Sequence, residues 1–303
     1  MAKRIFITGA TGYVGKNLMK ALLLKGHDVY ALKGDIADQI SLPGNIDVIY
    51  HCAGVIKKKE EMERVNVLGT ENIIKAAQEN NCVLIHLSSA GIIGSTNQAV
   101  LDENTACRPR NDYEMTKYRA EIAVKNAVKN GLRARILRPV VIFGPDKKTE
   151  GDSFFELLKS MRKGYYMNIG KGVCNMVHID EVVKALLALG EADTPFGDTY
   201  ILGNHLPYAE MDKIVKGASP AVLKKTMSFP YPVALAAASA LSLAAMIFRK
   251  KNPLTFSRLR VLTDNRIYSQ EKIEKGMHFQ NSFPVEEYLK KTCEKYIADG
   301  ALS

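Results

Sequence analysis

The sequence predicts an α/β fold in which helices cover both faces of a doubly wound parallel sheet, with a smaller, mostly C-terminal lobe added to it. Three observations lead to this prediction. Short apolar runs alternate with helical patterns, as they do when crossover helices connect parallel strands. A glycine-rich turn at residues 9–15 separates the first apolar run from the first helical pattern. The chain has 303 residues, of which 47% are hydrophobic, so it is long enough to bury a large core.

The expected elements follow this alternation from one end of the chain to the other. Strands are expected near residues 3–8, 28–32, 47–52, 82–87 and 133–138, with a later strand at Thr199–Leu202. Helices are expected near residues 14–25, 61–80, 113–130, 153–163, 180–190 and 208–216. The sequence shows no internal repeat.

The glycine turn is the most informative local pattern. Gly9, Gly12 and Gly15 follow the apolar run Ile5–Ile7 and open a helical pattern that continues from Lys16. In such a turn the first glycine permits the tight bend, the second lets the backbone approach a phosphate, and the third lets the helix pack on the strand. The helix N-terminus then offers N–H groups and a positive dipole end to an anion. The pattern therefore predicts a dinucleotide site of the Rossmann type.

A second pattern points to proton transfer. Tyr113 and Lys117 lie four residues apart in a helical segment, which places both side chains on one face. An ammonium beside a phenol stabilises the phenolate and is expected to lower the tyrosine pKa from about 10. Tyr113 can then exchange a proton with a substrate oxygen. Ser88 and Ser89 follow the apolar run Val83–Leu87, and a hydroxyl there can hydrogen-bond the same oxygen.

Further motifs follow these in a defined order. They are His51–Gly54, Asn66–Asn72, Ser88–Gly94, Leu101–Glu103, Pro109, Arg138–Pro139, Phe143–Pro145 and Val177–Glu181. Together with the glycine turn and the Tyr113–Lys117 pair, the series resembles the extended branch of the short-chain dehydrogenase/reductase superfamily over nearly the whole chain. That branch includes the NAD-dependent epimerases and dehydratases of nucleotide sugars, dihydroflavonol reductases and 3β-hydroxysteroid dehydrogenases.

The resemblance implies an enzyme with NAD(P) as cofactor and with Ser89, Tyr113 and Lys117 as catalytic residues. Ser89 falls on the family's catalytic position, five residues before Gly94. Cofactor contacts are implied for Gly9, Thr11, Gly12, Tyr13, Val14, Gly15, Lys33, Asp35, Ile36, Cys52, Ala53, Gly54, Asn66, Leu87, Ser88, Tyr113, Lys117, Pro139 and Val141. The resemblance also implies a homodimer formed through the helices that contain Asn66–Ala77 and Tyr113–Val124.

Two interleaved lobes are expected. Residues 1–145 and 176–203 form the dinucleotide-binding lobe, and residues 146–175 and 204–303 form the substrate lobe. The strand at Thr199–Leu202 returns the chain to the first lobe before the C-terminal part begins.

The residues that hold the adenosine ribose leave the choice between NAD and NADP open. An acidic residue about twenty positions after the glycine turn usually binds the ribose hydroxyls, but the family's position for it falls on Lys33. Lysine can pair with a 2′-phosphate instead, which favours NADP. Asp35 belongs either to the Gly34–Ile36 motif that touches the adenine, with an intervening loop and strand deleted, or substitutes for the ribose acid, which would favour NAD.

Two substitutions bear on the substrate. Many nucleotide-sugar members of the family carry an asparagine where this chain has Val141, and an arginine near the position of Asn175. We therefore expect oxidoreduction of a secondary alcohol or ketone in a small or lipid-like substrate. The alternatives are a nucleotide-sugar epimerase or dehydratase with tightly held NAD(P), and a non-catalytic NAD(P)-binding sensor. The complete set of Ser89, Tyr113 and Lys117 argues against the sensor.

Charge and cysteine content limit the kinds of binding partner and the cellular compartment that we expect. The net charge of +10 is scattered, with short clusters at residues 57–59, 147–148 and 249–251. We favour a basic solvated surface over a specific anionic partner, and no nucleic-acid motif accompanies these clusters. The five cysteines lack the spacing of a disulfide framework, and neither they nor the six histidines suggest a metal site. Because a strand begins almost at the first residue, no signal peptide is expected. These features indicate reduced thiols and a cytoplasmic protein.

One apolar segment raises the question of membrane association. Thr226–Phe248 contains no charged residue and is followed by Arg249, Lys250 and Lys251. A helix from Pro232 to Phe248 would have 17 residues, about 25 Å in length, against a bilayer core of roughly 30 Å. In order of preference, the segment is a helix packed in the substrate lobe, an interfacial helix that gives peripheral membrane contact through residues 230–251, or a transmembrane span.

Overall fold

The computed structural model describes residues 2–147, 152–164, 166–218, 226–248 and 256–302. The chain divides into two compact units. Unit 1 comprises Met1–Ile142, Ile179–Gly203 and Tyr268–Ser282, and unit 2 comprises Phe143–His178, Asn204–Ile267 and Phe283–Ser303. Four residues of the basic clusters, Lys148, Arg249, Lys250 and Lys251, lie outside the described residues.

Unit 1 includes the C-terminal segment Tyr268–Ser282, which we expected in the substrate lobe with the rest of residues 204–303. In this segment, helix α10 (Glu271–Met277) packs against strand β10 (Thr199–Leu202). The Ser269 N–H donates to the carbonyl of Leu101 at 2.8 Å, and Lys272 Nζ lies 2.8 Å from Asp198 Oδ1. Because these contacts join positions far apart in the chain, the order of the sequence motifs does not reveal them.

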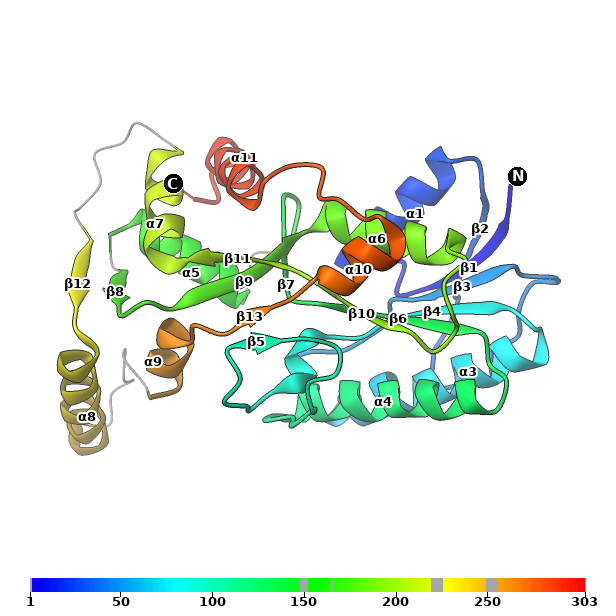
Figure 1. The fold of residues 1–303 in the computed structure, drawn as a ribbon, viewed down its shortest axis with the longest axis horizontal. Coiled ribbons are helices and arrows are strands. Elements are labelled where there is room, and N and C mark those ends of the chain that lie inside the picture. The colour runs from blue at the N-terminus through cyan, green and yellow to red at the C-terminus, as the bar shows by residue number, and fades with distance from the viewer. Residues whose placement is uncertain (1, 148–151, 165, 219–225, 249–255, 303) are drawn as a thin grey trace. The chain divides into compact units, whose positions relative to one another are not determined.

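A six-stranded parallel sheet forms the centre of unit 1 and confirms the predicted fold class (Figure 1). Its strand order is β10-β6-β4-β3-β1-β2. The strands are β1 (Arg4–Thr8), β2 (Asp28–Ala31), β3 (Val48–His51), β4 (Val83–Leu87), β6 (Ala134–Pro139) and β10. All six lie within about two residues of the predicted strands. The register pairs Phe6 with Ile49 and Ile49 with Leu84, so large apolar side chains line the same face.

Helices cover both faces of this sheet. Figure 1 shows α3 (Gly69–Glu79) and α4 (Asp112–Lys129) along one face, and α1 (Tyr13–Leu24) and α6 (Ile179–Glu191) on the other. The core under α3 and α4 contains fully buried Ile49, Ile73, Leu84, Val124 and Ile136. Shorter elements of unit 1 are a 3₁₀ turn, η2 (Ala90–Ile93), and strand β5 (Val100–Leu101), which pairs with β13 (Ile267–Tyr268).

The helix expected near residues 61–80 is interrupted. It consists of α2 (Lys59–Met62), a π-helical segment η1 (Glu63–Leu68) and then α3. A π-helical turn contains an additional residue and is often found at functional sites. Here it carries Arg64 and Asn66, and both side chains bond to loops that follow strands of the sheet.

Unit 2 has a smaller core built from helices on short strands. Strands β9 (Val173–His178) and β11 (Asn204–Pro207) pair antiparallel, and β7 (Val141–Phe143) adds to β9. Buried Leu158, Met161, Met176, Met211 and Leu289 pack together between the helices. The helices of this core are α5 (Ser153–Arg162), α7 (Tyr208–Gly217) and α11 (Val285–Ala298).

The apolar segment of unit 2 forms helix α8 (Tyr231–Phe248), which packs against α9 (Phe256–Thr263). Strand β12 (Met227–Phe229) precedes it and pairs with β8 (Met167–Ile169). Ala234 and Ala238 are the buried residues of α8 among positions 231–241. In the part of the chain that the structure describes, no helix has the length and apolar character needed to cross a bilayer.

A buried ion pair joins α4 to the centre of the sheet. Arg138 on β6 donates through Nε to Glu121 Oε2 at 2.9 Å, and its Nη2 lies 2.5 Å from Oε1. Both side chains are almost fully buried, at 2% and 1% exposure. Lys125 Nζ lies 2.7 Å from Glu121 Oε1. Although burial alone would raise the pKa of Glu121, the hydrogen bond and charge of Arg138, together with Lys125, lower it to about 2.

The pair predicts a specific acid dependence of stability. Replacing Glu121 by Ala should lower the free energy of unfolding by about 3–5 kcal/mol, because Arg138 is left buried and unpaired. Since the pKa of Glu121 is lower in the folded chain, its stabilisation is complete above pH 4.5, the ordinary value, and is lost as the pH falls towards 2. Urea denaturation of the Glu121→Gln variant should therefore show a shallower loss of stability across this pH range. If the Glu121→Gln variant loses stability in acid as steeply as the wild-type protein does, Glu121 is not the source of this dependence. The control is Glu63→Gln, because Glu63 forms an exposed pair with Arg119.

Candidate active site

Most of the predicted site residues meet at one edge of the sheet. Because the strands are parallel, their carboxyl ends lie together. The glycine turn follows β1, Cys52–Gly54 follows β3, Ser88 and Ser89 follow β4, and Pro139 ends β6. Val141, which lies two residues after Pro139, has an exposed side chain.

The glycine turn is closely packed against its surroundings. Gly9 has a φ of 69°, which favours glycine, and a Cβ there would lie 2.6 Å from the Ala53 nitrogen. A Cβ on Gly15 would lie 2.1 Å from the Gly9 carbonyl oxygen. The Gly12 N–H closes the turn by donating to the same carbonyl at 2.9 Å. The turn therefore holds β1, α1 and the segment after β3 at distances that larger residues would not permit.

The start of α1 has the character of an anion site. Gly12 is its N-cap and supplies no side-chain acceptor, and the first turn contains no acidic residue. Helix N-termini carry N–H groups that the helix itself does not bond, and a positive dipole end. Thr11 is exposed in the turn, and Tyr13 and Val14 begin the helix with half-buried side chains. These features fit the pyrophosphate of a dinucleotide.

A chain of buried polar groups positions the segment after β3. Thr8 Oγ1 lies 2.7 Å from His51 Nδ1, and His51 Nε2 lies 2.9 Å from Thr70 Oγ1. Thr8 Oγ1 also accepts from the Ala53 N–H at 3.2 Å. Burial lowers the pKa of His51 to about 3, with a smaller contribution from the charge of Lys117. His51 is therefore neutral, and it links two threonines rather than exchanging protons.

Asn66 ties this segment to the helix that carries Tyr113 and Lys117. Its Oδ1 accepts from the Val55 N–H at 2.8 Å, and its Nδ2 donates to the Val55 carbonyl and to Thr116 Oγ1, both at 3.0 Å. Asn66 is almost fully buried. Its amide thus holds the loop after β3 beside α4.

Ser89, Tyr113 and Lys117 lie together at the ends of β4 and α4. The Ser89 side chain acts on the Tyr113 phenol and lowers its pKa, and Ser89 Oγ accepts from the Gly91 N–H at 3.2 Å. Lys117 is buried and donates to the Leu87 carbonyl at 2.6 Å. Asn111 caps α4 by accepting from the Glu114 N–H at 2.9 Å, which positions the first turn that contains Tyr113.

The pKa of Tyr113 corrects one expectation. Burial raises it, and this outweighs the lowering by the Ser89 side chain. Burial also lowers the pKa of Lys117 to about 8, while Glu121 acts in the opposite direction. The predicted lowering of the tyrosine pKa is therefore wrong, because burial of the phenol outweighs the group that lowers its pKa.

Glu121 is a residue of this edge that the sequence reasoning missed. Besides Arg138 and Lys125, it accepts from Ser88 Oγ at 2.7 Å. Ser88 directly follows Leu87, whose carbonyl holds Lys117. The available signal was position, because Glu121 lies four residues after Lys117 and therefore on the same face of the helix.

The residues expected at the adenosine end lie beyond the edge strand β2. Lys33 and Asp35 are exposed, and Ile36 is buried, with its side chain against the backbone of Gly69. The described residues between Ala31 and Val48 contain no strand. Asp35 Oδ1 accepts from the Ala37 N–H at 2.9 Å, and its Oδ2 pairs with Arg64. The bond from Ala37, followed by Arg64, lowers the pKa of Asp35.

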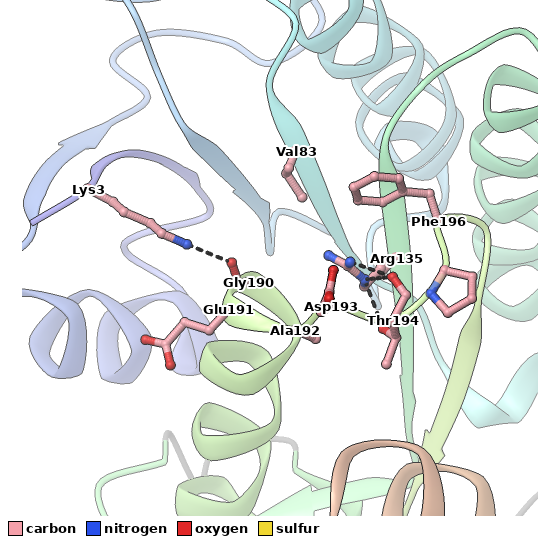
Figure 2. Close-up of a pocket in the computed structure, with 10 residues that line it drawn as sticks. Lys3, Val83, Arg135, Gly190, Glu191, Ala192, Asp193, Thr194 and Phe196 are labelled. Carbon is pink, nitrogen blue, oxygen red and sulfur yellow. Dashed lines mark hydrogen bonds between the residues drawn. The ribbon is translucent and has the colours of Figure 1, made fainter. Parts of the chain in front are cut away.

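A pocket of about 430 Å³ lies at the opposite edge of the sheet, where β4 and β6 begin (Figure 2). Arg135 and Lys3 are its basic residues, and both bond to carbonyls near the end of α6. Arg135 Nη1 donates to Leu189 at 3.2 Å, and Lys3 Nζ donates to Gly190 at 3.1 Å. The ring of Phe196 lies 4.5 Å from the Arg135 guanidinium carbon. The pocket contains none of the predicted site residues.

Comparison with curated proteins identifies related enzymes. The chain is 26% identical over 232 residues to a 4-hydroxy-2-methyl-3-oxo-4-farnesyl-3,4-dihydroquinoline-1-oxide ketoreductase of Stigmatella aurantiaca, covering 67% of this chain and 69% of the relative. It is 27% identical over 277 residues to a decarboxylating sterol-4-alpha-carboxylate 3-dehydrogenase of Candida albicans, covering 86% and 79%.

The fold is also found in solved structures. UDP-glucose 4-epimerase of Thermotoga maritima, solved with UDP-glucose, superposes with a TM-score of 0.76 at 17% identity, covering 98% of this chain and 99% of that one. The model of the NAD dependent epimerase/dehydratase family matches residues 5–203, which include the glycine turn, Ser89, Tyr113 and Lys117. The chain therefore belongs to the NAD dependent epimerase/dehydratase family and is an enzyme of the extended short-chain dehydrogenase/reductase type.

Proposed function

We propose that this enzyme interconverts a secondary alcohol and a ketone in a small or lipid-like substrate, with Ser89, Tyr113 and Lys117 at the reacting oxygen. The observation that carries the proposal is the placement of Ser89 after β4 next to Tyr113 on α4, where its side chain acts on the phenol, with the buried Lys117 one helical turn further on and bonded to the Leu87 carbonyl at 2.6 Å. Two hydroxyls held in this way can bind one substrate oxygen. Bound NAD(P) supplies or accepts the hydride at the carbon that carries this oxygen.

Each of the three residues has a distinct part in the reaction. Tyr113 donates its phenolic proton to the substrate oxygen during reduction and accepts it during oxidation. Ser89 orients that oxygen by a second hydrogen bond. Lys117, held by the Leu87 carbonyl, lies one helical turn after Tyr113, and its positive charge stabilises the phenolate that forms.

Net oxidoreduction is favoured over epimerisation by the residues near the substrate. Val141 stands where many nucleotide-sugar members of the family have an asparagine, and Asn175 donates its amide to the Arg266 carbonyl at 2.8 Å. The names of the ketoreductase and the sterol dehydrogenase also support a ketone or alcohol substrate. Epimerisation or dehydration of a nucleotide sugar is the second candidate, since the family includes such enzymes. We assign the selection of the substrate to unit 2.

We propose NADP as the preferred cofactor. Lys33 is exposed just beyond the end of β2, at the position where an acid would bind the ribose hydroxyls of NAD. The Asp35 carboxylate is engaged by Ala37 and Arg64. A cation at the ribose is the partner expected for a 2′-phosphate.

We also propose a cytoplasmic homodimer that forms through α3 and α4. These two helices pack side by side in unit 1. Leu68, next to the start of α3, and Met115 and Ile122 on α4 are large apolar residues with exposed side chains. A second copy of the same surface would cover them.

Peripheral membrane contact through residues 230–251 is the last part of the proposal. The side chains of Tyr231, Val233, Leu235 and Leu241 on α8 are exposed, Val233 to 52%. A helix that is apolar on all sides is normally covered, whereas α8 buries only Ala234 and Ala238 among its described side chains. Nearby on β12 and α9, Met227, Phe256 and Val261 are also exposed.

Charge argues for an anionic lipid surface as the occupant of this face. The uncharged stretch from Thr226 to Phe248 is bracketed in the sequence by Lys224 and Lys225 before it and by Arg249–Lys251 after it. Basic residues that flank an interfacial helix are attracted to anionic headgroups while its apolar side chains enter the acyl boundary. A lipid-like substrate would be drawn from the same surface.

Replacing Tyr113 by Phe should lower kcat for ketone reduction by about 10²- to 10⁴-fold, because the proton donor is lost, while NADPH binding persists. The measurement is NADPH oxidation with a panel of sterol ketones and smaller ketones, with Tyr118→Phe on the same helix as control. Unchanged turnover in the Tyr113→Phe variant would contradict the mechanism. Conversion of a nucleotide sugar without net NADPH consumption would instead support the epimerase candidate.

The membrane contact can be tested with vesicles. Wild-type protein should sediment with vesicles that contain phosphatidylserine and less with phosphatidylcholine alone. Leu235→Glu combined with Leu241→Glu should weaken binding at least about tenfold, since charges would enter the apolar boundary. Leu24→Glu, at a 79% exposed position of α1, is the control. If the double variant sediments with the vesicles as much as the wild-type protein does, the proposal is contradicted. It is also contradicted if the double variant loses self-association but keeps its vesicle binding.

A further inference from the structure

The π-helical segment η1 directs one arginine towards the adenosine end of the site. Arg64 forms an ion pair with Asp35, 29 residues earlier in the chain. Its side chain is 50% exposed, so the guanidinium remains accessible to solvent and to a ligand. Asp35 lies two residues after Lys33, in the segment that leaves the edge strand β2.

An isolated structural role explains this ion pair poorly. Both partners are substantially exposed, and exposed ion pairs contribute little to stability. Asp35 already has a partner of its own in the Ala37 N–H at 2.9 Å. The carboxylate therefore holds the guanidinium at Asp35, two residues after Lys33, which we assign to the ribose.

The chemistry of the cluster matches a phosphate more closely than a hydroxyl. Arginine presents N–H groups in a planar fork that binds phosphate oxygens in pairs, and lysine adds a point charge. Lys33 and Arg64 together carry two positive charges against the single negative charge of Asp35. In the dinucleotide fold the adenosine ribose lies just outside the carboxyl end of the second strand, where the loop with Lys33 and Asp35 begins.

We propose that Arg64 is a second specificity-determining residue for the cofactor and binds the 2′-phosphate of NADP together with Lys33, while Asp35 positions its guanidinium. The inference rests on the proposed preference for NADP and adds the residue that completes the phosphate site. Arg64 comes from η1 rather than from the loop after β2, so one phosphate joins two segments that are distant in sequence.

The test is isothermal titration of the full-length protein with NADPH and with NADH. Replacing Arg64 by Ala should weaken NADPH binding by about 10- to 100-fold, as expected for the loss of charge-assisted hydrogen bonds, and should leave NADH binding within about twofold. Arg64→Lys should recover part of the NADPH affinity, because it keeps the charge but not the fork. Arg119→Ala is the matched control, since Arg119 forms a similarly exposed pair with Glu63 of the same π-helical segment.

The outcomes separate this inference from the proposed cofactor preference. If the wild-type protein binds NADH more tightly and Lys33→Ala changes nothing, the NADP preference fails and the phosphate site with it. If NADPH is preferred and Lys33→Ala removes the preference but Arg64→Ala does not, only the role of Arg64 is overturned. Equal weakening of NADPH and NADH in Arg64→Ala, in protein with an unchanged circular dichroism melting curve, would also overturn it.

Discussion

The edge of unit 1 that carries Ser89, Tyr113 and Lys117 depends on one buried carboxylate, that of Glu121. An ionised group in the interior is tolerated only when its partners compensate the charge, and Glu121 has such partners on β6 and on the segment after β4. Arg138 pairs with it from the sheet, and Ser88 donates to it from the residue next to Leu87. The Leu87 carbonyl in turn accepts from Lys117, so Glu121, Ser88 and Lys117 belong to one connected group of buried polar contacts.

Features that depend on residues close together in the sequence could be predicted, and features that depend on contacts between distant residues could not. Strand β4 and helix α4 follow from local patterns of apolar residues and capping groups, and the structure has them within about two residues of the prediction. The glycine turn was equally predictable, because the three glycines that define it lie within seven consecutive residues. The Arg64–Asp35 pair and the packing of Tyr268–Ser282 into unit 1 were not, because no local pattern identifies which distant residues meet.

The pKa of Tyr113 could not be predicted from residue spacing for the same reason. Spacing correctly placed Tyr113 and Lys117 on one helix, but not the carbonyl that the ammonium would bond. With burial raising the tyrosine pKa, the phenol keeps its proton at neutral pH. A protonated phenol beside Ser89 is suited to donate to a ketone oxygen, which agrees with the proposed reduction. Lys117, with a pKa of about 8, is still mostly charged at neutral pH and can stabilise the phenolate that results.

The residues around Glu121 and the residues proposed to select the cofactor and to contact the membrane therefore differ in burial. The groups around Glu121 are buried and share partners, so a change in one disturbs the others. Lys33, Arg64 and the outer face of α8 are exposed, and substitutions at such positions usually alter stability by less than about 0.5 kcal/mol. The proposed cofactor preference and membrane contact can accordingly be altered by substitution while Ser89, Tyr113 and Lys117 remain in place. Loss of NADPH affinity or of vesicle binding in such variants would then report on recognition itself rather than on the integrity of the fold.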